Sequence, residues 1–372
     1  VKEKIIGSQT YILDQEFIKN NSNKSIPELL AKLPGVKIKD LYGGGPGAKQ
    51  SVDIRGFGDT ATSNTLILLN GQRLTNIDLS LVDFTTIPRD TIDRIEVIMG
   101  NSTVLYGNNS TAGSINIITD QSINKEDQIN ANFYVGSLGK YGSFLNGIKK
   151  FNNFSVKGNQ NLIFSDGYRR NSALYQNNGS IELAYDRGGY NLYINLKSHN
   201  QFQELPGDVG VNTGNFSNSN GFEIDPRSSD TPNDFSQNNG HQIFYGATFD
   251  VTRSNKLIID GSYKYNKSEG KFLSSSSDTD TRISSYQISP RLLSDFKILG
   301  QSTDTIVGTD LNYAYYYSDR MSTGKTWYKR YKASDINLAP YFNSNIKLSD
   351  NDDLSVGFRY QWNWLRAGDT NN

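Results

Sequence analysis

One stretch decides the fold of this chain, Ser51–Asp120, which reads SVDIRGFGDTATSNTLILLNGQRLTNIDLSLVDFTTIPRDTIDRIEVIMGNSTVLYGNNSTAGSINIITD. Strand-like runs, tight turns and short helix starts all fall within it, and this mixture ends at its last residue. Thr65–Leu69 and Gln72–Leu74 flank Asn70-Gly71, and Asn-Gly supplies the two positive φ angles of a type I′ hairpin turn. The stretch therefore predicts a compact α+β unit.

The remaining parts of this unit are predicted from local signals. Ile95–Met99 and Ser114–Thr119 predict two further strands, and Pro88 is suited to begin a helical turn. Upstream, Ser25 and Glu28 form a capping box before the apolar face Ile26, Leu29, Leu30 and Leu33. The segments Phe57–Asn64, Thr75–Thr86 and Gly100–Gly113 are predicted as loops.

A glycine-rich segment, GGGPGAK at residues 43–49, invites comparison with a nucleotide-binding loop. Such a loop must end in Gly-Lys-Ser/Thr and begin a helix, so that backbone amides face the phosphates. Here Lys49 is followed by Gln50, and a predicted strand follows. A surface loop is the better interpretation.

Composition excludes several functional classes. The chain has 372 residues, with Lys+Arg 38 balanced by Asp+Glu 38, so no basic field points to nucleic acid. It has no Cys and only two His, so disulfides and thiolate metal sites are excluded. No apolar run approaches the roughly 20 residues of a membrane helix, and no signal peptide is visible at Val1. The 22 Tyr, 18 Phe and 34 Gly favour a β protein.

After Asp120 the pattern changes to strict alternation. Clear examples are the runs 129–135, 242–251, 257–266, 307–316 and 354–364, in which apolar or aromatic residues alternate with polar ones. Strands of about 10 residues with one apolar face are typical of a transmembrane barrel wall, although a sandwich or propeller also alternates. We count roughly 11 strands here.

The connections between these strands differ in length. Short links are predicted near Phe151–Asn153, Arg187–Gly189, Arg253–Asn255 and Ser349–Asp352. Long links are predicted near Gly167–Gln176, Gln203–Gln237, Glu269–Asp280 and Asp319–Lys329. Short turns at one rim and long loops at the other are typical of outer-membrane barrels. Half a barrel has open edges that lipid does not tolerate, so the sequence is interpreted as a partial chain.

A string of motifs carries a family resemblance: LPGV (Leu33–Val36), DIRGFG (Asp53–Gly58), LLNGQRL (Leu68–Leu74), IDRIEVIMG (Ile92–Gly100), LYG (Leu105–Gly107) and AGSINIIT (Ala112–Thr119). In this order they resemble the plug domain of TonB-dependent outer-membrane receptors. The departures, at Met99, Gly100-Asn101 and Gly113-Ser114, are local substitutions.

The resemblance implies a fold and a function. It predicts an α+β plug domain at residues 1–122 inside an antiparallel transmembrane β-barrel, whose N-terminal portion covers residues 123–372. It further implies import of a scarce large solute, such as a ferric siderophore or cobalamin, across the Gram-negative outer membrane. The implied partners are TonB with its inner-membrane energising complex, outer-membrane lipid, and a small-molecule or metal-chelate ligand. Lys2–Ser8 is the candidate for the TonB-binding segment.

The resemblance also suggests site residues. Arginines of the corresponding motifs seat the plug on the wall, which assigns plug–barrel anchoring to Arg55 and Arg94, with Glu96 beside them. Loop residues and exposed aromatics suit an amphipathic ligand, although each could equally pack between loops or at the membrane interface. The ligand-binding candidates are Tyr42, Gly44, Phe57, Asp59, Asn64, Tyr168, Trp327 and Tyr328.

Other groups of residues give weaker indications of function. The carboxylates of Gln203–Gln237 could bind a loop Ca²⁺, but without EF-hand spacing solvated charge is the better interpretation. These carboxylates are Asp208, Glu223, Asp225, Asp230 and Asp234. No catalytic motif is present, so no enzyme, cofactor or metal site is predicted. The alternatives left open are a surface-exposed β-barrel that binds or adheres without transport, and an outer-membrane enzyme.

Overall fold

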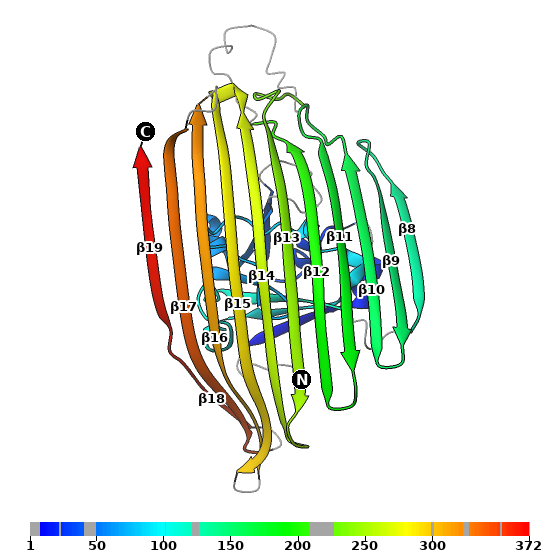
Figure 1. The fold of residues 1–372 in the computed structure, drawn as a ribbon, viewed down its shortest axis with the longest axis vertical. Helices are drawn as coiled ribbons and strands as arrows, with labels where there is room; N and C mark the ends of the chain where they lie inside the picture. Colours follow the sequence, from blue (N-terminus) through cyan, green and yellow to red (C-terminus); the bar gives the residue numbers. More distant parts are fainter. Residues whose placement is uncertain are drawn as a thin grey trace.

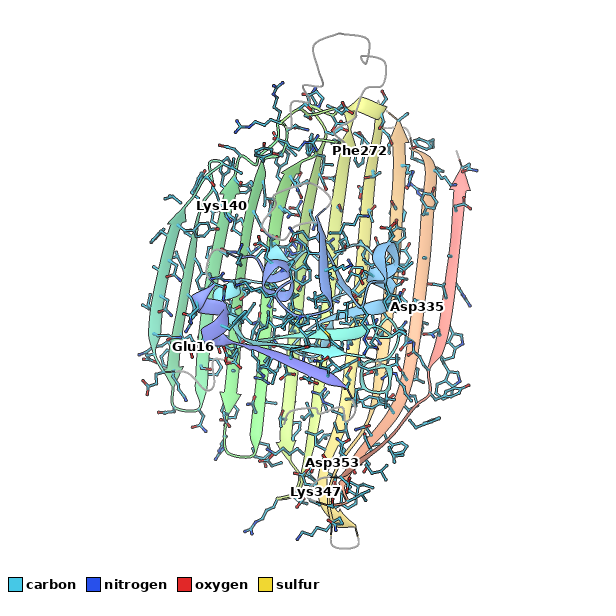
Figure 2. The ribbon with its side chains drawn as sticks, turned by 180° about the vertical axis from the view of Figure 1, so that it is seen from behind. Glu16, Lys140, Phe272, Asp335, Lys347 and Asp353 are labelled. Carbon is cyan, nitrogen blue, oxygen red and sulfur yellow. The ribbon has the colours of Figure 1, made fainter. Side chains whose placement is uncertain are left out.

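The computed structural model describes residues 8–21, 24–40, 50–100, 102–120, 126–207, 227–298, 301–322, 327–349 and 352–371. These residues form two parts, an N-terminal unit up to residue 120 and a long antiparallel sheet. The N-terminal unit lies against one face of that sheet, behind it in Figure 1 and in front of it in Figure 2. Among the described residues, no helix is both long and apolar enough to cross a membrane.

The N-terminal unit mixes short strands with short helices. Its five-stranded sheet has the order β1-β6-β7-β4-β5, and β2 pairs with β3 separately. The elements are β1 (Gln9–Asp14), α1 (Gln15–Asn20), α2 (Ile26–Leu30), β2 (Val36–Asp40), β3 (Gln50–Ile54), η1 (Gly58–Thr60), α3 (Ala61–Asn64), β4 (Thr65–Leu69), β5 (Gln72–Arg73), η2 (Phe84–Thr86), η3 (Arg89–Thr91), β6 (Ile92–Met99), α4 (Thr103–Tyr106) and β7 (Gly113–Thr119).

Several local predictions for this unit are confirmed. Asn70 and Gly71 have φ angles of 52° and 79°, as the hairpin turn between β4 and β5 requires. Ser25 and Glu28 form the predicted capping box at the start of α2. Three loop predictions are wrong in part, because the polar segment after Phe57 folds into η1 and α3, the segment Thr75–Thr86 ends in η2, and the segment after Gly100 contains α4.

The core of the unit is apolar and fully enclosed. Its centre is made by side chains from α2, β3, β6 and β7, among them Leu29, Ile54, Ile95 and Ile115, each with no measurable exposure. Burial of such side chains stabilises a fold by about 1.5–3 kcal/mol each. The N-terminal unit therefore has a core of its own, to which the long sheet adds Phe244.

The long sheet contains twelve described strands, each antiparallel to its neighbours. They are β8 (Gln128–Val135), β9 (Tyr141–Phe151), β10 (Phe154–Ser165), β11 (Leu174–Asp186), β12 (Tyr190–Glu204), β13 (Phe235–Asp250), β14 (Asn255–Phe272), β15 (Ser277–Ile298), β16 (Gln301–Ser322), β17 (Trp327–Lys347), β18 (Asp353–Arg359) and β19 (Trp362–Asn371), with a 3₁₀ turn η6 (Leu273–Ser275) after β14. β18 and β19 both pair with β17, along successive stretches, so they fill one position in the sheet.

The sheet has two faces of different chemistry. Apolar side chains such as Leu192, Tyr286, Val307 and Leu311 alternate outward and are exposed, which is the predicted pattern. The opposite face carries buried polar side chains such as Gln176, and the N-terminal unit covers it. Figure 2 places Phe272 at one rim, and Lys347 with Asp353 at the other.

Two of the predicted long links are wrong. β14 continues to Phe272 and β15 begins at Ser277, so most of Glu269–Asp280 is paired strand. Likewise, β16 reaches Ser322 and β17 begins at Trp327. The polar residues in these segments misled the prediction, because cross-strand pairing extends the strands beyond their apolar part. The domain boundary predicted at 122/123 lies outside the described residues.

Two prolines interrupt the pairing at one height of the sheet. Pro290 in β15 and Pro340 in β17 both lie level with Thr309 of the strand between them, β16. The β15–β16 pairing skips Pro290, and the break between β18 and β19 falls opposite Pro340. Proline has no amide hydrogen to donate to a neighbouring strand, which accounts for both interruptions.

Candidate functional site

The candidate site is the junction at which the N-terminal unit rests on β14–β18. Arg73, in the strand β5 that follows the Asn70-Gly71 turn, joins the unit to the sheet through its backbone. Its backbone amide donates to Oε1 of Gln287 at 3.2 Å, and its carbonyl accepts a hydrogen bond from Nζ of Lys264. Two side chains of the sheet, Gln287 and Lys264, thus hydrogen-bond to the backbone that follows the hairpin turn.

The Arg73 side chain turns back into its own unit. Its guanidinium donates to the carbonyls of Tyr106 and Asn108, at 3.1 and 2.9 Å, and to Oδ1 of Asn109 at 3.0 Å. Burial, together with the nearby Arg359, lowers the pKa of Arg73 to about 10, although Asp310 and Asp335 oppose the shift. An arginine at this pKa stays charged at neutral pH, so Arg73 is a fixed positive charge at the junction.

Arg359 is the matching residue on the sheet. Its Nη2 lies 2.8 Å from Oδ2 of Asp310, and its Nη1 donates to the Leu105 carbonyl of α4 at 3.4 Å. The guanidinium also lies over the Tyr341 ring, 5.3 Å from the ring centre. The Arg359 side chain is only 7% exposed, so this ion pair is shielded from solvent screening.

Gly107 makes the close approach of Arg359 possible. A Cβ atom at this position would lie 2.8 Å from Nη2 of Arg359, and the residue has φ +80° and ψ −153°, a conformation that glycine alone adopts readily. The motif LYG therefore has a physical reason here: its last residue leaves room for a guanidinium from the sheet.

The junction is charged and hollow as well as apolar. A small cavity lies between the two parts and is lined by Arg73, Tyr106, Asp310 and Arg359, among others. Leu105 packs beside it against Leu293, Ile306 and Tyr341 of the sheet. The ionisable side chains gathered at the junction are Arg73, Lys264, Arg291, Arg359, Asp260, Asp310 and Asp335, and Figure 2 shows Asp335 beside the N-terminal unit.

A second contact lies toward β10–β12. Nζ of Lys157 donates to the Asp120 carbonyl at 2.7 Å, and Nδ2 of Asn178 donates to the Thr85 carbonyl at 2.8 Å. A second small cavity is lined there by both residues together with Lys197 and His199. Both contacts join a sheet side chain to a backbone carbonyl of the N-terminal unit. Such bonds contribute only about 1–3 kcal/mol each, so they can be exchanged for water.

The predicted anchoring residues have their described contacts inside the N-terminal unit. Arg55 is exposed, and its Nη2 donates to the Met99 carbonyl at 3.4 Å. Arg94 pairs with Asp93 and with Glu96, each at 2.8 Å. Burial opposes its charge, but these hydrogen bonds raise the pKa of Arg94 above its ordinary value. Within the described residues, Arg73 and Arg359 join the two parts instead, and anchoring by the predicted residues remains a prediction.

Three of the predicted ligand-binding residues lie on one exposed edge of the N-terminal unit. Phe57 is 39% exposed, and Asp59 pairs with Lys39 at 2.7 Å, a hydrogen bond that lowers the pKa of the Asp59 carboxyl. Asn64 ends α3, where its side chain donates to the Thr60 carbonyl at 2.9 Å. Tyr42 and Gly44 lie outside the described residues.

The predicted aromatics of the sheet are placed differently from one another. Tyr168, in the link between β10 and β11, is exposed beneath the guanidinium of Arg227. Tyr328 is exposed, with its hydroxyl 3.5 Å from Oγ of Ser277. Trp327 begins β17 rather than lying in a loop, and it stacks with Arg330 on the face away from the N-terminal unit. Ligand contact by these aromatics remains a prediction.

The carboxylates considered for Ca²⁺ are only partly described. Asp208, Glu223 and Asp225 lie outside the described residues. The backbone of Asp234 bonds to Thr231, Leu205 and Asn171, and that of Asp230 to Pro206. Among the residues that the structure describes, no group of three His, Cys, Asp or Glu side chains could hold a metal ion.

Sequence reasoning missed both central residues of the junction. Arg73 lies inside the motif LLNGQRL, so its position after a tight turn was visible but not its burial. Arg359 was read only as a polar residue of an alternating strand. A signal was available, because a motif glycine that admits no side chain implies a close neighbour.

Comparison with known proteins agrees with this architecture. Residues 2–114 match the family model described as "TonB-dependent Receptor Plug Domain". The chain is 38% identical over 108 residues to the Vitamin B12 transporter BtuB of Photobacterium profundum, which covers 29% of the chain and 17% of that relative. It is 30% identical over 122 residues to the ferric enterobactin receptor of Pseudomonas aeruginosa, which covers 30% of the chain and 16% of the relative.

Solved structures extend the likeness to the long sheet. The ferric citrate transporter FecA in its unliganded form superposes with a TM-score of 0.81 at 17% identity, over 98% of this chain and 57% of FecA. The P. aeruginosa receptor FpvA, bound to a heterologous pyoverdine, gives 0.82 at 13% identity, over 100% of this chain and 54% of FpvA. The chain thus spans little more than half of these proteins. The resemblance is confirmed: residues 2–114 belong to the plug domain family of TonB-dependent receptors, and the chain has the fold of the plug and of part of the barrel wall of these outer-membrane proteins.

Proposed function

We propose that this chain acts in TonB-dependent import of a scarce, large solute across the outer membrane. The observation that carries the proposal is the junction, where the plug rests on the sheet through hydrogen bonds, one small apolar cluster and two cavities. The plug has its own apolar core. It can therefore shift against the wall while most of its core stays intact.

The chemistry of the site supports transport rather than catalysis. The matching relatives are named as transporters and receptors. The arginine–carboxylate pairs at the junction, Arg359 with Asp310 and Arg291 with Asp260, lie within the sheet and fix its inner face. Transport by plug displacement needs no catalytic group, because the energy is supplied by the partner. We propose TonB, with its inner-membrane complex, as that partner.

We propose a chelated metal or a cobalamin as the solute. One of the named relatives carries vitamin B12 and another receives ferric enterobactin, but their similarity to this chain covers the plug alone and does not select between the two. Ligand capture is assigned to plug residues Tyr42, Gly44, Phe57, Asp59 and Asn64, together with the sheet residues Tyr168 and Tyr328. Aromatic rings beside polar groups suit an amphipathic solute.

Uptake of radiolabelled cobalamin and of several radiolabelled iron chelates tests this proposal, in cells with and without TonB. We expect one solute to enter in a TonB-dependent manner. Entry of every solute without TonB contradicts active transport. Tight binding of a solute without any uptake supports the alternative, a surface receptor or adhesin.

A further inference from the structure

The outward face of β14–β17 carries side chains in ordered rows, which follow from the pairing register. One row is aromatic: Tyr263, Tyr286 and Tyr313 are neighbours on adjacent strands, with ring centres 4.7 and 6.1 Å apart. Their rings are on the face away from the plug, and Tyr286 is 49% exposed. Toward the rim where the strands are joined by short links (the short-link rim), the same face of β15 continues with Ile288, Pro290 and Leu292.

On β14–β17, charged residues begin four positions beyond the tyrosine row, toward the opposite rim. The register places Lys267, Arg282, Tyr317 and Lys332 side by side in one row. The next row on the same face is Glu269, Asp280, Asp319 and Arg330. Arg366 of β19 lies on this face as well, opposite Ser334. We call these residues, apart from Tyr317, the outer charged patch.

The patch holds more positive than negative charge. Its three carboxylates are each paired within it: Lys267 with Glu269 at 2.7 Å, Arg282 with Asp280 at 2.9 Å, and Arg330 with Asp319 at 2.7 Å. Lys332 and Arg366 are exposed, and no described carboxylate lies within ion-pair distance of either. Lys332 and Arg366 can therefore bind an external anion, beside the three ion pairs of the patch.

The position of the patch identifies the anion. Tyrosines gather where the hydrocarbon of a bilayer meets its headgroups. The outer charged patch, which lies beyond the tyrosine row, is therefore at the height of the headgroups. The face is continuous with the apolar band below it, so an occupant must also contact hydrocarbon. We propose that the outer charged patch binds a phosphate-bearing headgroup of an outer-leaflet lipid. Lysine and arginine near a membrane surface attract anionic lipid, and arginine also pairs well with phosphate. The proposal rests on the membrane location of the sheet and not on the solute.

The test compares lipid binding by the full chain in detergent, with diphosphorylated lipid A as probe and its dephosphorylated form as reference. We expect wild type to prefer the phosphorylated lipid. The variant Lys332→Gln/Arg366→Gln should bind it more weakly, by about fivefold for each cation removed, while its affinity for the dephosphorylated lipid stays the same. Lys149→Gln is the matched control, because Lys149 of β9 is exposed near the short-link rim and paired with Asp127.

Each outcome decides the proposal. Equal affinity of wild type for the two lipids overturns it. So does an equal loss in the control, or a loss that extends to the dephosphorylated lipid, because either result would reflect folding or general charge rather than this patch. TonB-dependent uptake measured on the same variants keeps the two proposals separate, since headgroup binding can fail while transport persists.

Discussion

At the scale of single residues, Gly107 shows how a motif position depends on a distant contact. We expect Gly107→Ala to lower the free energy of unfolding by about 3 kcal/mol, because the backbone is strained for alanine and the new Cβ meets Arg359. Urea titration in detergent measures this change. In an Arg359→Met background at least about 1 kcal/mol of the cost should disappear. An identical cost in both backgrounds would show that Arg359 is not involved.

Asp310 is the second informative residue, because it neutralises Arg359 away from solvent. We expect Asp310→Asn to lower the free energy of unfolding by about 3–5 kcal/mol, since it leaves a buried guanidinium without its carboxylate. Asp59→Asn is the matched control: its pair with Lys39 is exposed, so its unfolding curve should coincide with that of wild type. Equal behaviour of the two variants would mean that the Asp310 pair is solvated.

At the scale of elements, α4 is the helix of the plug that contacts the sheet most closely. A Cβ atom built on Gly357 of β18 lies 2.8 Å from Cγ1 of Val104, close enough for a disulfide to form. Because the chain contains no Cys, Val104→Cys combined with Gly357→Cys introduces a single possible bridge. We expect oxidation of this variant to reduce uptake at least tenfold and reduction to restore it.

Two control measurements show whether a loss of uptake is caused by the disulfide between positions 104 and 357. Each single variant, oxidised in the same way, should transport like wild type, and the oxidised pair should still bind the solute. Transport at the wild-type rate by the oxidised pair would show that α4 remains on the wall during import, so that another part of the plug moves.

At the scale of the whole molecule, the outward face must contact lipid. Ile288 lies in the apolar band of β15, whereas Ser284 lies on the same face nearer the charged patch. We expect Ile288→Arg to cost about 2–4 kcal/mol of folding free energy in lipid vesicles, and Ser284→Arg about 0–1 kcal/mol. Similar costs at both positions would place the bilayer elsewhere on the sheet.

The architecture could be predicted from sequence because its signals are local. The Asn70-Gly71 turn and the Ser25–Glu28 capping box each depend on neighbouring residues. Alternation likewise reports which face of a strand is apolar. The strand ends in Glu269–Asp280 could not be read in this way, because their pairing partners lie on other strands.

The site was harder to predict than the fold. Arg73 and Arg359 are separated by most of the chain, and only folding brings them to one cavity. Trp327 shows a limit of the alternation pattern. The sequence places it in a loop, but it begins β17 and turns outward, toward Arg330. Period-two patterns place a residue on one of two faces, and an irregularity such as the one after Arg320 changes the assignment.

Pro290 and Pro340 have a consequence for how the wall responds to load. Pro290 interrupts the β15–β16 pairing beside Thr309, and Pro340 lies opposite the break between β18 and β19, while Thr309 and Pro340 stay paired. The sheet therefore has fewer hydrogen bonds at the height where Arg359 and Asp310 meet the plug. Force transmitted through the plug would reach the wall at this height. We therefore expect the wall to deform elastically here before the paired stretches toward either rim do.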